Sequence, residues 1–211
     1  MPTEDPMIRR VTLYFDPACP WTWQTSRWLV DAAAAHDVPV EYAALELTDG
    51  EPIDELPTDR RDAARASRAF LRGVTAARAD ARHDLIGRWY TAFGTPRWHD
   101  HQEPSVDLVR TTLTSAGGDD LLDALDDPTL DEPMARSRQE ALSWAGDDVG
   151  SPVTVWDLGD RQRGFFGPVV APHPRANRDA LWDVVSRAAT VTELFELKAR
   201  RTNTPTDTPP D

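Results

Sequence analysis

The sequence is short of cysteine, lysine and long hydrophobic runs. Cys19 is the sole cysteine among 211 residues, so no disulfide can form within the chain and a disulfide-stapled scaffold is excluded. No segment approaches the ~20 apolar residues of a membrane span. The first residues are acidic, whereas a signal peptide begins with positive charge. We therefore expect a cytoplasmic protein with no membrane partner.

Basic charge is also scarce. The chain has 36 Asp and Glu against 23 Lys and Arg, a net charge of -13, and its only lysine is Lys198. Nucleic acids and anionic membranes are bound chiefly by clustered Lys and Arg, so we expect no nucleic-acid partner. No glycine-rich phosphate loop or G-x-G-x-x-G motif is present. Flavin or nucleotide binding therefore has no support, and any reducing equivalents are expected from a thiol.

Apolar residues are nevertheless plentiful enough for a core. Hydrophobic residues make up 40% of the chain, including 8 Trp and 6 Phe, which argues against a disordered protein. A strand is predicted at residues 11–15, a helix at 20–36 and a second strand at 38–45, because apolar residues follow strand and helix periodicities there. This β-α-β order implies two parallel strands. A late β-hairpin is predicted from residues 153–156 and 164–167.

The stretch between the second strand and the hairpin has a different character. From residue 48 to about 148 it is rich in Ala, Arg and Leu at helical spacing, with prolines between the segments. Helices are predicted at residues 59–81, 84–93, 105–116, 119–125, 132–145 and, after the hairpin, 178–189, with a further helical turn or two at 191–201. Residues 94–102, which contain Trp98, His99 and His101, are predicted as a loop.

This pattern predicts a discontinuous organisation. One unit consists of residues 1–47 and 149–201, and a helical insertion occupies residues 48–148. Residues 202–211 are Thr, Pro and Asp with no apolar anchor, and are predicted to be a disordered tail. Oligomeric state stays open between a monomer and a homodimer.

Cys19 lies where the first strand leads into the first helix. Unpaired backbone N–H groups and the positive end of the helix dipole favour a thiolate there. Such a position is able to lower a thiol pKa from about 8.5 to roughly 3.5. Pro20 suits the first helical position, Trp21 is expected to shield the sulfur, and the Thr22 hydroxyl to donate to it. Cys19 is therefore the candidate nucleophile.

Several short motifs, spread over nearly the whole chain, carry a family pattern: residues 15–23 (FDPACPWTW), 25–28 (TSRW), 90–94 (YTAFG) with His99 following, 148–152 (DVGSP), 165–169 (FFGPV) with Pro174 and Arg175, and 196–198 (ELK). In this order they resemble the DsbA-like branch of the thioredoxin superfamily. The resemblance is greatest to the mycothiol-dependent nitroreductase family of actinobacteria.

The resemblance implies an α/β protein with a DsbA-like thioredoxin fold and a large inserted all-helical region that covers the site. It implies that Cys19 is the attacking thiol and that His99 lines the site as a proton donor or thiolate partner. It also implies that Ser151–Pro152 is a cis bond facing Cys19. Cis geometry would expose the Ser151 backbone N–H and C=O, which would pair with an extended thiol ligand or peptide. Pro20, Trp21, Ser151 and Pro152 would then contact a low-molecular-weight thiol, with mycothiol suspected.

The chain departs from the family at one decisive position. The family pattern is Cys-Pro-Trp-Cys, and here Thr22 replaces the second cysteine. A dithiol clears a mixed disulfide with its own second thiol, whereas a monothiol needs an external one. The first hypothesis is thus a monothiol oxidoreductase that acts on a disulfide or electrophilic small molecule through a Cys19 mixed disulfide.

Two alternatives stay open. In one, the protein is a thiol transferase or isomerase similar to kappa-class glutathione transferases, in which Thr22 activates a bound cofactor thiol. In the other, it is a catalytically weakened binding protein. No metal is expected, because His99 and His101 lack both a further Cys and the i, i+4 spacing of a helical metal site. Arg27 and Arg175 are candidates for binding a carboxylate or sugar hydroxyls, but ion pairs are the more common use of arginine in so acidic a chain.

Overall fold

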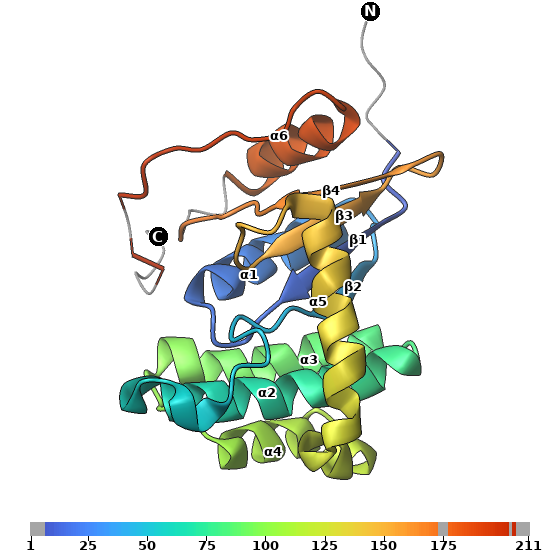
Figure 1. Cartoon of the computed structure of the whole chain (residues 1–211). Coiled ribbons are helices and arrows are strands. Elements are labelled where there is room, and N and C mark those ends of the chain that lie inside the picture. Colours follow the sequence, from blue (N-terminus) through green and yellow to red (C-terminus); the bar gives the residue numbers. More distant parts are fainter. Residues whose placement is uncertain (1–6, 173–176, 203, 206–211) are drawn as a thin grey trace, which may run out of the picture.

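The computed structural model describes residues 7–172, 177–202 and 204–205 (Figure 1). Its sheet has the strand order β2-β1-β3-β4. The strands are β1 (Arg10–Phe15), β2 (Val40–Ala44), β3 (Val153–Asp157) and β4 (Gln162–Phe166). β2 is parallel to β1, while β1 and β3, and β3 and β4, are antiparallel. The predicted β-α-β unit and late hairpin are therefore confirmed.

Side-chain alternation along β1 gives the sheet two buried faces. Leu13 and Phe15 point to the face covered by α1 (Pro20–Ala35) and α6 (Arg178–Thr190), and belong to the largest core cluster. Tyr14 points the opposite way, toward α5 (Asp131–Ala145). Burial on both faces explains why β1 reads as a continuous apolar run.

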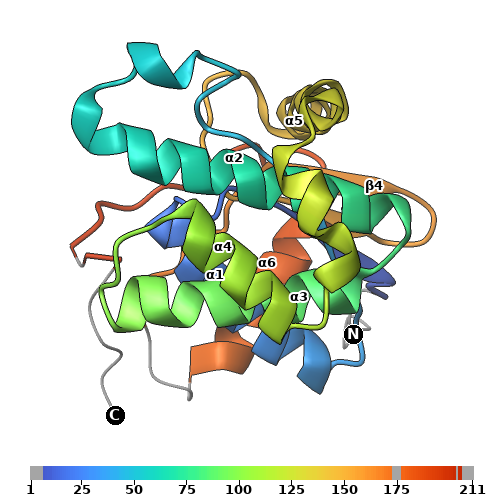
Figure 2. The same cartoon turned by 90° about the horizontal axis from the view of Figure 1, so that it is seen from below.

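The chain between β2 and β3 is helical. It contains α2 (Thr58–Ala79), α3 (His83–Gly94) and α4 (Val106–Ser115), which lie in front of the sheet when the molecule is seen from below (Figure 2). The same stretch contains α5 and the short elements η1 (Ile53–Glu55), η2 (Thr95–His99), η3 (Asp119–Asp126) and η4 (Pro128–Leu130).

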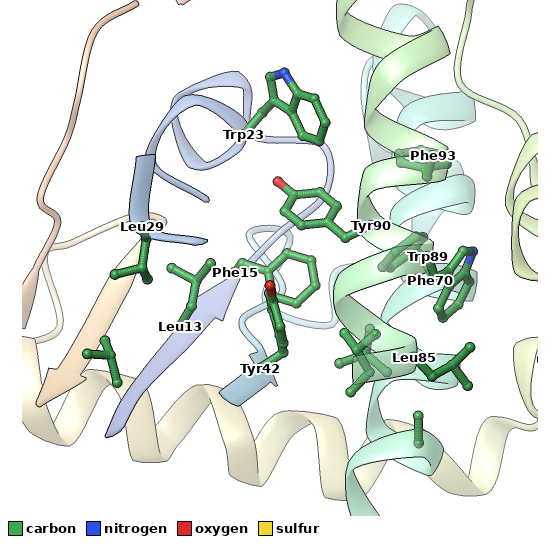
Figure 3. Packing of buried hydrophobic residues seen from close by; sticks show 14 of the residues in the cluster. Leu13, Phe15, Trp23, Leu29, Tyr42, Phe70, Leu85, Trp89, Tyr90 and Phe93 are labelled. Atoms are coloured by element: carbon green, nitrogen blue, oxygen red, sulfur yellow. The ribbon is translucent and has the colours of Figure 1, made fainter. Parts of the chain in front are cut away.

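One aromatic core joins the sheet to these helices. The Phe15 ring of β1 lies 4.6 Å from Tyr90 of α3 and 6.1 Å from Phe70 of α2, measured between ring centroids. Phe70 in turn stacks on Trp89 at 3.8 Å (Figure 3). Aromatic pairs add about 0.5–1.5 kcal/mol each beyond the area they bury. The division at residues 47/48 and 148/149 stays a prediction, and the apolar core runs across it.

Three predicted elements differ from the structure. The loop predicted at 94–102 is wrong, because residues Thr95–His99 form a π-helical turn that extends α3. Pro96 has no N–H for the carbonyl one turn back, and the Asp100 N–H instead bonds to the Thr95 carbonyl, five residues earlier. Residues Asp119–Asp126 are 3-10 rather than α-helix.

The further helical turns predicted at 191–201 are also wrong. Val191 has an extended backbone after α6, and residues 191–200 are exposed and irregular. Without a buried face they have no packing to support a short helix. Most of the predicted tail at 202–211, and Pro174 and Arg175, lie outside the described residues. Within the described residues, no helix is long and apolar enough to cross a membrane.

Candidate active site around Cys19

Cys19 occupies the N-cap of α1, at the end of a tight turn that leaves β1. Its N–H donates to the Asp16 carbonyl at 3.0 Å, and its own carbonyl accepts the first helical hydrogen bond, from Trp23. Pro20 occupies the first helical position, where its missing N–H costs nothing. Cys19 is 8% exposed. The strand-to-helix junction expected from the sequence is therefore present.

The segment before β3 lies directly against this junction. The Ser151–Pro152 peptide bond is cis, and the Cys19 thiol donates to the Ser151 carbonyl at 3.4 Å. Thr22 Oγ1 shares a hydrogen bond of 2.6 Å with Ser151 Oγ, which also accepts from the Asp16 N–H at 3.1 Å. Cys19 and Thr22 thus form one buried polar cluster with Ser151, which is distant from both in the sequence.

Burial decides the protonation of Cys19. Removal from water raises the pKa of the thiol, and the Asp16 carboxylate adds to that rise. Hydrogen bonds from the Thr22 side chain and from the backbone N–H groups of Thr22 and Trp21 lower the pKa in part. The expected lowering by the helix start is therefore outweighed. The protonated thiol is also the form that is able to donate to the Ser151 carbonyl.

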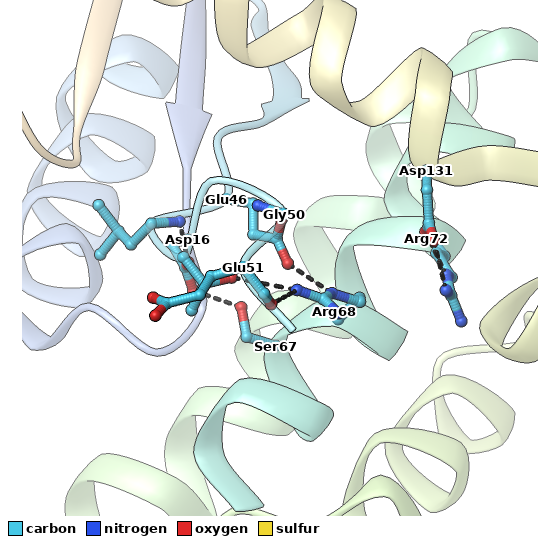
Figure 4. Close-up of polar contacts among 10 residues, drawn as sticks. Asp16, Glu46, Gly50, Glu51, Ser67, Arg68, Arg72 and Asp131 are labelled. Carbon is cyan, nitrogen blue, oxygen red and sulfur yellow. Dashed lines mark hydrogen bonds and ion pairs between the residues drawn. The ribbon is translucent and has the colours of Figure 1, made fainter. Parts of the chain in front are cut away.

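Asp16 is the site residue that sequence reasoning missed. Its carboxylate is 2% exposed and accepts from Ser67 Oγ at 2.5 Å and from the Leu47 and Ala18 N–H groups at 2.8 Å (Figure 4). Burial raises its pKa, while these hydrogen bonds oppose the rise. An Asp-Pro pair after a strand is typical of a turn, so nothing local indicated that Ser67 of α2 would bond to it.

His99 lies near the site but does not touch the sulfur. Its ring is exposed and stands edge-on to Trp23, with 6.5 Å between centroids. Within the described residues, no hydrogen bond joins His99 to Cys19. Trp23 itself is 2% exposed and packs edge-on against Tyr90 at 5.5 Å. The π-helical turn therefore brings His99 to the site's aromatic wall.

Arg27 belongs to the same wall. Its guanidinium carbon lies 4.2 Å from the Trp23 ring centroid and 5.7 Å from that of Tyr90, and it donates to Thr91 Oγ1 at 2.7 Å. No carboxylate pairs with it among the described residues, so the expected ion pair is wrong. One of its terminal nitrogens is buried without a hydrogen-bond partner there.

A small hollow opens beside the Cys19 turn. It brings the turn together with α2, the end of α3 and the π-helical turn, and its lining consists of Pro17, Ala18, Ala63, Ser67, Phe93, Arg97 and Pro104. Among the described residues, no group of three or more His, Cys, Asp or Glu side chains is placed to hold a metal ion. The chemistry of the site therefore rests on one sulfur, hydroxyls and backbone groups.

Solved structures of other proteins share this architecture. A probable DsbA oxidoreductase from Streptomyces coelicolor, SCO1869, is similar with a TM-score of 0.58 and 19% identity, over 92% of this chain and 94% of its own. A putative protein disulfide isomerase from Nitrosomonas europaea is similar with a TM-score of 0.57 and 12% identity, over 84% and 98%. The DsbA-like thioredoxin fold expected from the sequence is confirmed.

Sequence similarity is more specific. The uncharacterized protein Rv2286c of Mycobacterium tuberculosis is 29% identical over 208 residues, which cover 93% of this chain and 84% of that protein. The model of the Rv2466c-like family, described as mycothiol-dependent nitroreductase Rv2466c, matches residues 18–199. That match spans well over half of the chain and includes Cys19, Ser151 and the helical region. This protein therefore belongs to the Rv2466c-like mycothiol-dependent nitroreductase family.

Proposed function

We propose that this protein is a thiol-dependent oxidoreductase that works with a single thiol, through a mixed disulfide between Cys19 and a low-molecular-weight thiol. The family name supports mycothiol as that thiol. The observation that carries the proposal is the buried cluster in which the Cys19 thiol and the Thr22 hydroxyl both meet Ser151. A hydroxyl at position 22 orders the site but cannot close a disulfide with Cys19.

The reaction proceeds by three exchanges. The Cys19 thiol loses its proton and attacks one sulfur of a disulfide substrate, so that the substrate S–S bond breaks and its second sulfur leaves as a thiolate and takes up a proton. A low-molecular-weight thiol then attacks the Cys19 sulfur of this mixed disulfide, releases the rest of the substrate as a second thiol and stays joined to Cys19 in a new mixed disulfide. A second low-molecular-weight thiol attacks the sulfur of the first, which frees Cys19 as a thiol and leaves the disulfide of the two external thiols. One disulfide is reduced, and the external thiols supply both electrons.

Binding would use the backbone that now engages Cys19. Extended ligands pair with exposed backbone N–H and C=O groups, and the Ser151 carbonyl currently accepts from the Cys19 thiol. A ligand that displaces this hydrogen bond frees the sulfur to react. Pro20, Trp21 and Pro152 would contact the thiol beside it. His99 would donate the proton to the leaving thiolate, at the rim formed with Trp23.

The runner-up is a thiol transferase or isomerase in which Thr22 activates a bound thiol. The raised pKa of Cys19 favours it, because a protonated sulfur is a poor nucleophile. Against it, the Thr22 side chain is 0% exposed and is already bonded to Ser151. A bound thiol would have to break that hydrogen bond to reach Thr22. The third hypothesis, a binding protein with weakened catalysis, predicts that no thiol-dependent turnover will be observed.

The test compares wild-type protein with Cys19→Ser, using mycothiol and a small disulfide, with glutathione in place of mycothiol as the thiol control. We expect turnover and a mass adduct of one thiol on the wild type, and neither on Cys19→Ser. Turnover retained by Cys19→Ser would refute the nucleophilic role and favour the transferase. A wild type without any thiol-dependent turnover would favour the binding protein. His99→Gln should lower turnover about 100-fold without slowing alkylation of Cys19.

A further inference from the structure

The described C-terminal segment, residues 191–202 and 204–205, returns to the active-site helix. Arg163 of β4 anchors its first part, since its guanidinium donates to the Leu194 carbonyl at 2.6 Å. Its last part reaches the first turns of α1, where Gln24 Nε2 donates to the Pro205 carbonyl at 2.8 Å. In Figures 1 and 2 the red trace of this segment runs beside the dark blue start of α1. The segment therefore ends beside the first turns of α1, the helix that begins after Cys19.

This return places Arg201 over Trp21. The guanidinium carbon lies 4.9 Å from the Trp21 ring centroid, two residues beyond Cys19. Arg201 is exposed, and no carboxylate pairs with it among the described residues. A guanidinium stacked on an aromatic face keeps the N–H groups at its edge free, and their planar fork matches a carboxylate. Arg201 thus presents an unused anion-binding edge at the mouth of the site.

Arg97 provides a second guanidinium near the Cys19 turn. It lines the hollow together with Pro17 and Ala18 and lies over the Trp98 ring at 4.4 Å. One of its N–H groups donates to the Gln102 carbonyl at 3.3 Å, and it too pairs with no carboxylate in the parts of the chain that the structure describes. One cation therefore lies near Ala18 and the other over Trp21, the residues that flank Cys19 and Pro20 in the sequence.

These two cations lie in a strongly acidic chain. Acidic residues outnumber basic ones by 36 to 23, and many arginines, such as Arg68 with Glu46 and Arg72 with Asp131, are held by carboxylates. A net charge of -13 repels anions from most of the surface. A cationic mouth would offset that repulsion at the one place where a substrate meets Cys19.

We propose that Arg97 and Arg201 are specificity-determining residues that select a substrate with a carboxylate next to the group attacked by Cys19. The proposal deepens the proposed function and rests on it, because Cys19 must be the reacting nucleophile. The carboxylate would bind to the guanidinium edges while the electrophilic atom meets the sulfur. Each cation attracts a unit negative charge about 7 Å away strongly enough to favour it roughly threefold, even with water-like screening.

Iodoacetate and iodoacetamide test this selectivity, because they react at the same carbon and differ in charge. In each case the Cys19 sulfur loses its proton, attacks the CH₂ carbon and displaces iodide, leaving a thioether. Cys19 is the only thiol in the chain, so the modified mass reports this site alone. Both reagents react with the same thiolate, so the ratio of the two rates cancels any change in the pKa of Cys19. Dividing this ratio by the one for free N-acetylcysteine removes the difference in intrinsic reactivity between the reagents.

We expect Arg201→Gln and Arg97→Gln each to lower the normalised iodoacetate-to-iodoacetamide ratio about threefold. Arg200→Gln, an equal charge change one residue from Arg201, should lower it less, because no contact among the described residues places Arg200 over Trp21. In the wild type the ratio should fall as salt rises. A ratio that both substitutions leave unchanged would overturn the anion selectivity alone. Folded protein that neither reagent alkylates would overturn the nucleophilic role of Cys19, and this selectivity with it.

Discussion

Thr22 Oγ1 and Ser151 Oγ lie 2.6 Å apart and share a hydrogen bond. Both residues are buried, with 0% and 6% of their surface exposed. The contact joins the first turn of α1 to the residue before Pro152, and the Cys19 thiol bonds to the carbonyl of that same residue. The position that carries a second sulfur in the Cys-Pro-Trp-Cys pattern therefore serves here as a structural tie, and Ser151 holds both side chains.

Restoring the second sulfur should change what oxidation produces. We expect Thr22→Cys to close a disulfide with Cys19, because its own thiol then attacks any mixed disulfide formed there. Intact mass after treatment with an oxidised small thiol should show the loss of two hydrogens, whereas the wild type should carry the thiol as an adduct. Thr22→Ser, which keeps a hydroxyl, should behave as the wild type. A stable adduct on Thr22→Cys would contradict the monothiol interpretation.

Removing the Thr22 hydroxyl should make Cys19 harder to ionise. The hydrogen bond from Thr22 lowers the pKa of Cys19 against the effect of burial, so Thr22→Val should raise that pKa. The alkylation rate with iodoacetamide, measured against pH, should shift to higher pH. The variant should also lose about 1 kcal/mol of unfolding free energy, because Ser151 Oγ loses a buried partner. Thr22→Ser is the control, and an unchanged profile in Thr22→Val would contradict this role.

Asp16 should make the stability of the protein depend on pH. Burial holds its pKa above the usual 3.8, so the folded state binds this proton more tightly than the unfolded state. The resulting stabilisation is present below pH 3.8 and is lost as pH rises through the folded pKa. Relative to Asp16→Asn, the wild-type free energy of unfolding in urea should therefore fall with rising pH and then level off.

Asp120 provides the opposite sign for comparison. The Arg82 guanidinium lowers the pKa of Asp120, so its contribution is present at higher pH and is lost as pH falls. The difference between wild type and Asp120→Asn should rise with pH or stay flat. An Asp16 difference that rises with pH would show that the hydrogen bonds to Asp16 outweigh its burial and that its pKa is lowered instead.

The close packing of Gly94 under Trp23 gives a prediction about the aromatic wall. A Cβ at residue 94 would lie 2.7 Å from Trp23 Cη2 and nearer still to two other ring atoms. Gly94→Ala should therefore displace Trp23, cost about 1–3 kcal/mol and lower turnover, since His99 rests on that ring. Thermal unfolding would measure the loss of stability, tryptophan fluorescence the displacement of Trp23, and the disulfide assay the loss of turnover.

Gly150 is the matched control. A Cβ there would meet its nearest neighbour, Leu47 Cδ2, at 3.8 Å, an ordinary contact. Gly150→Ala should change stability by less than about 0.5 kcal/mol. If the two variants unfolded at the same temperature, residue 94 would have room for a side chain beside Trp23, and the close packing would be refuted.

The local sequence pattern predicted the secondary structure correctly wherever a residue's neighbours in sequence are also its neighbours in space. The strand before Cys19, the helix that begins at Pro20 and the late hairpin follow from periodicity and proline placement, and they appear with shifts of a few residues. The π-helical turn at Thr95–His99 does not follow from the local pattern, because a proline such as Pro96 usually indicates the end of a helix. The irregular course of residues 191–202 and 204–205 depends on Arg163 and Gln24, which are distant in sequence.

The sequence by itself determined that one thiol, at the start of a helix, must carry any sulfur chemistry of this protein, since Cys19 is the only cysteine. Only the tertiary structure decided the state of that thiol. Burial against Ser151 and near Asp16 raises its pKa, although the helix start favours the opposite. Desolvation depends on every segment that excludes water from the sulfur. The residues that surround this sulfur include 16–22 and 151, and no local pattern in the sequence shows that these two segments meet.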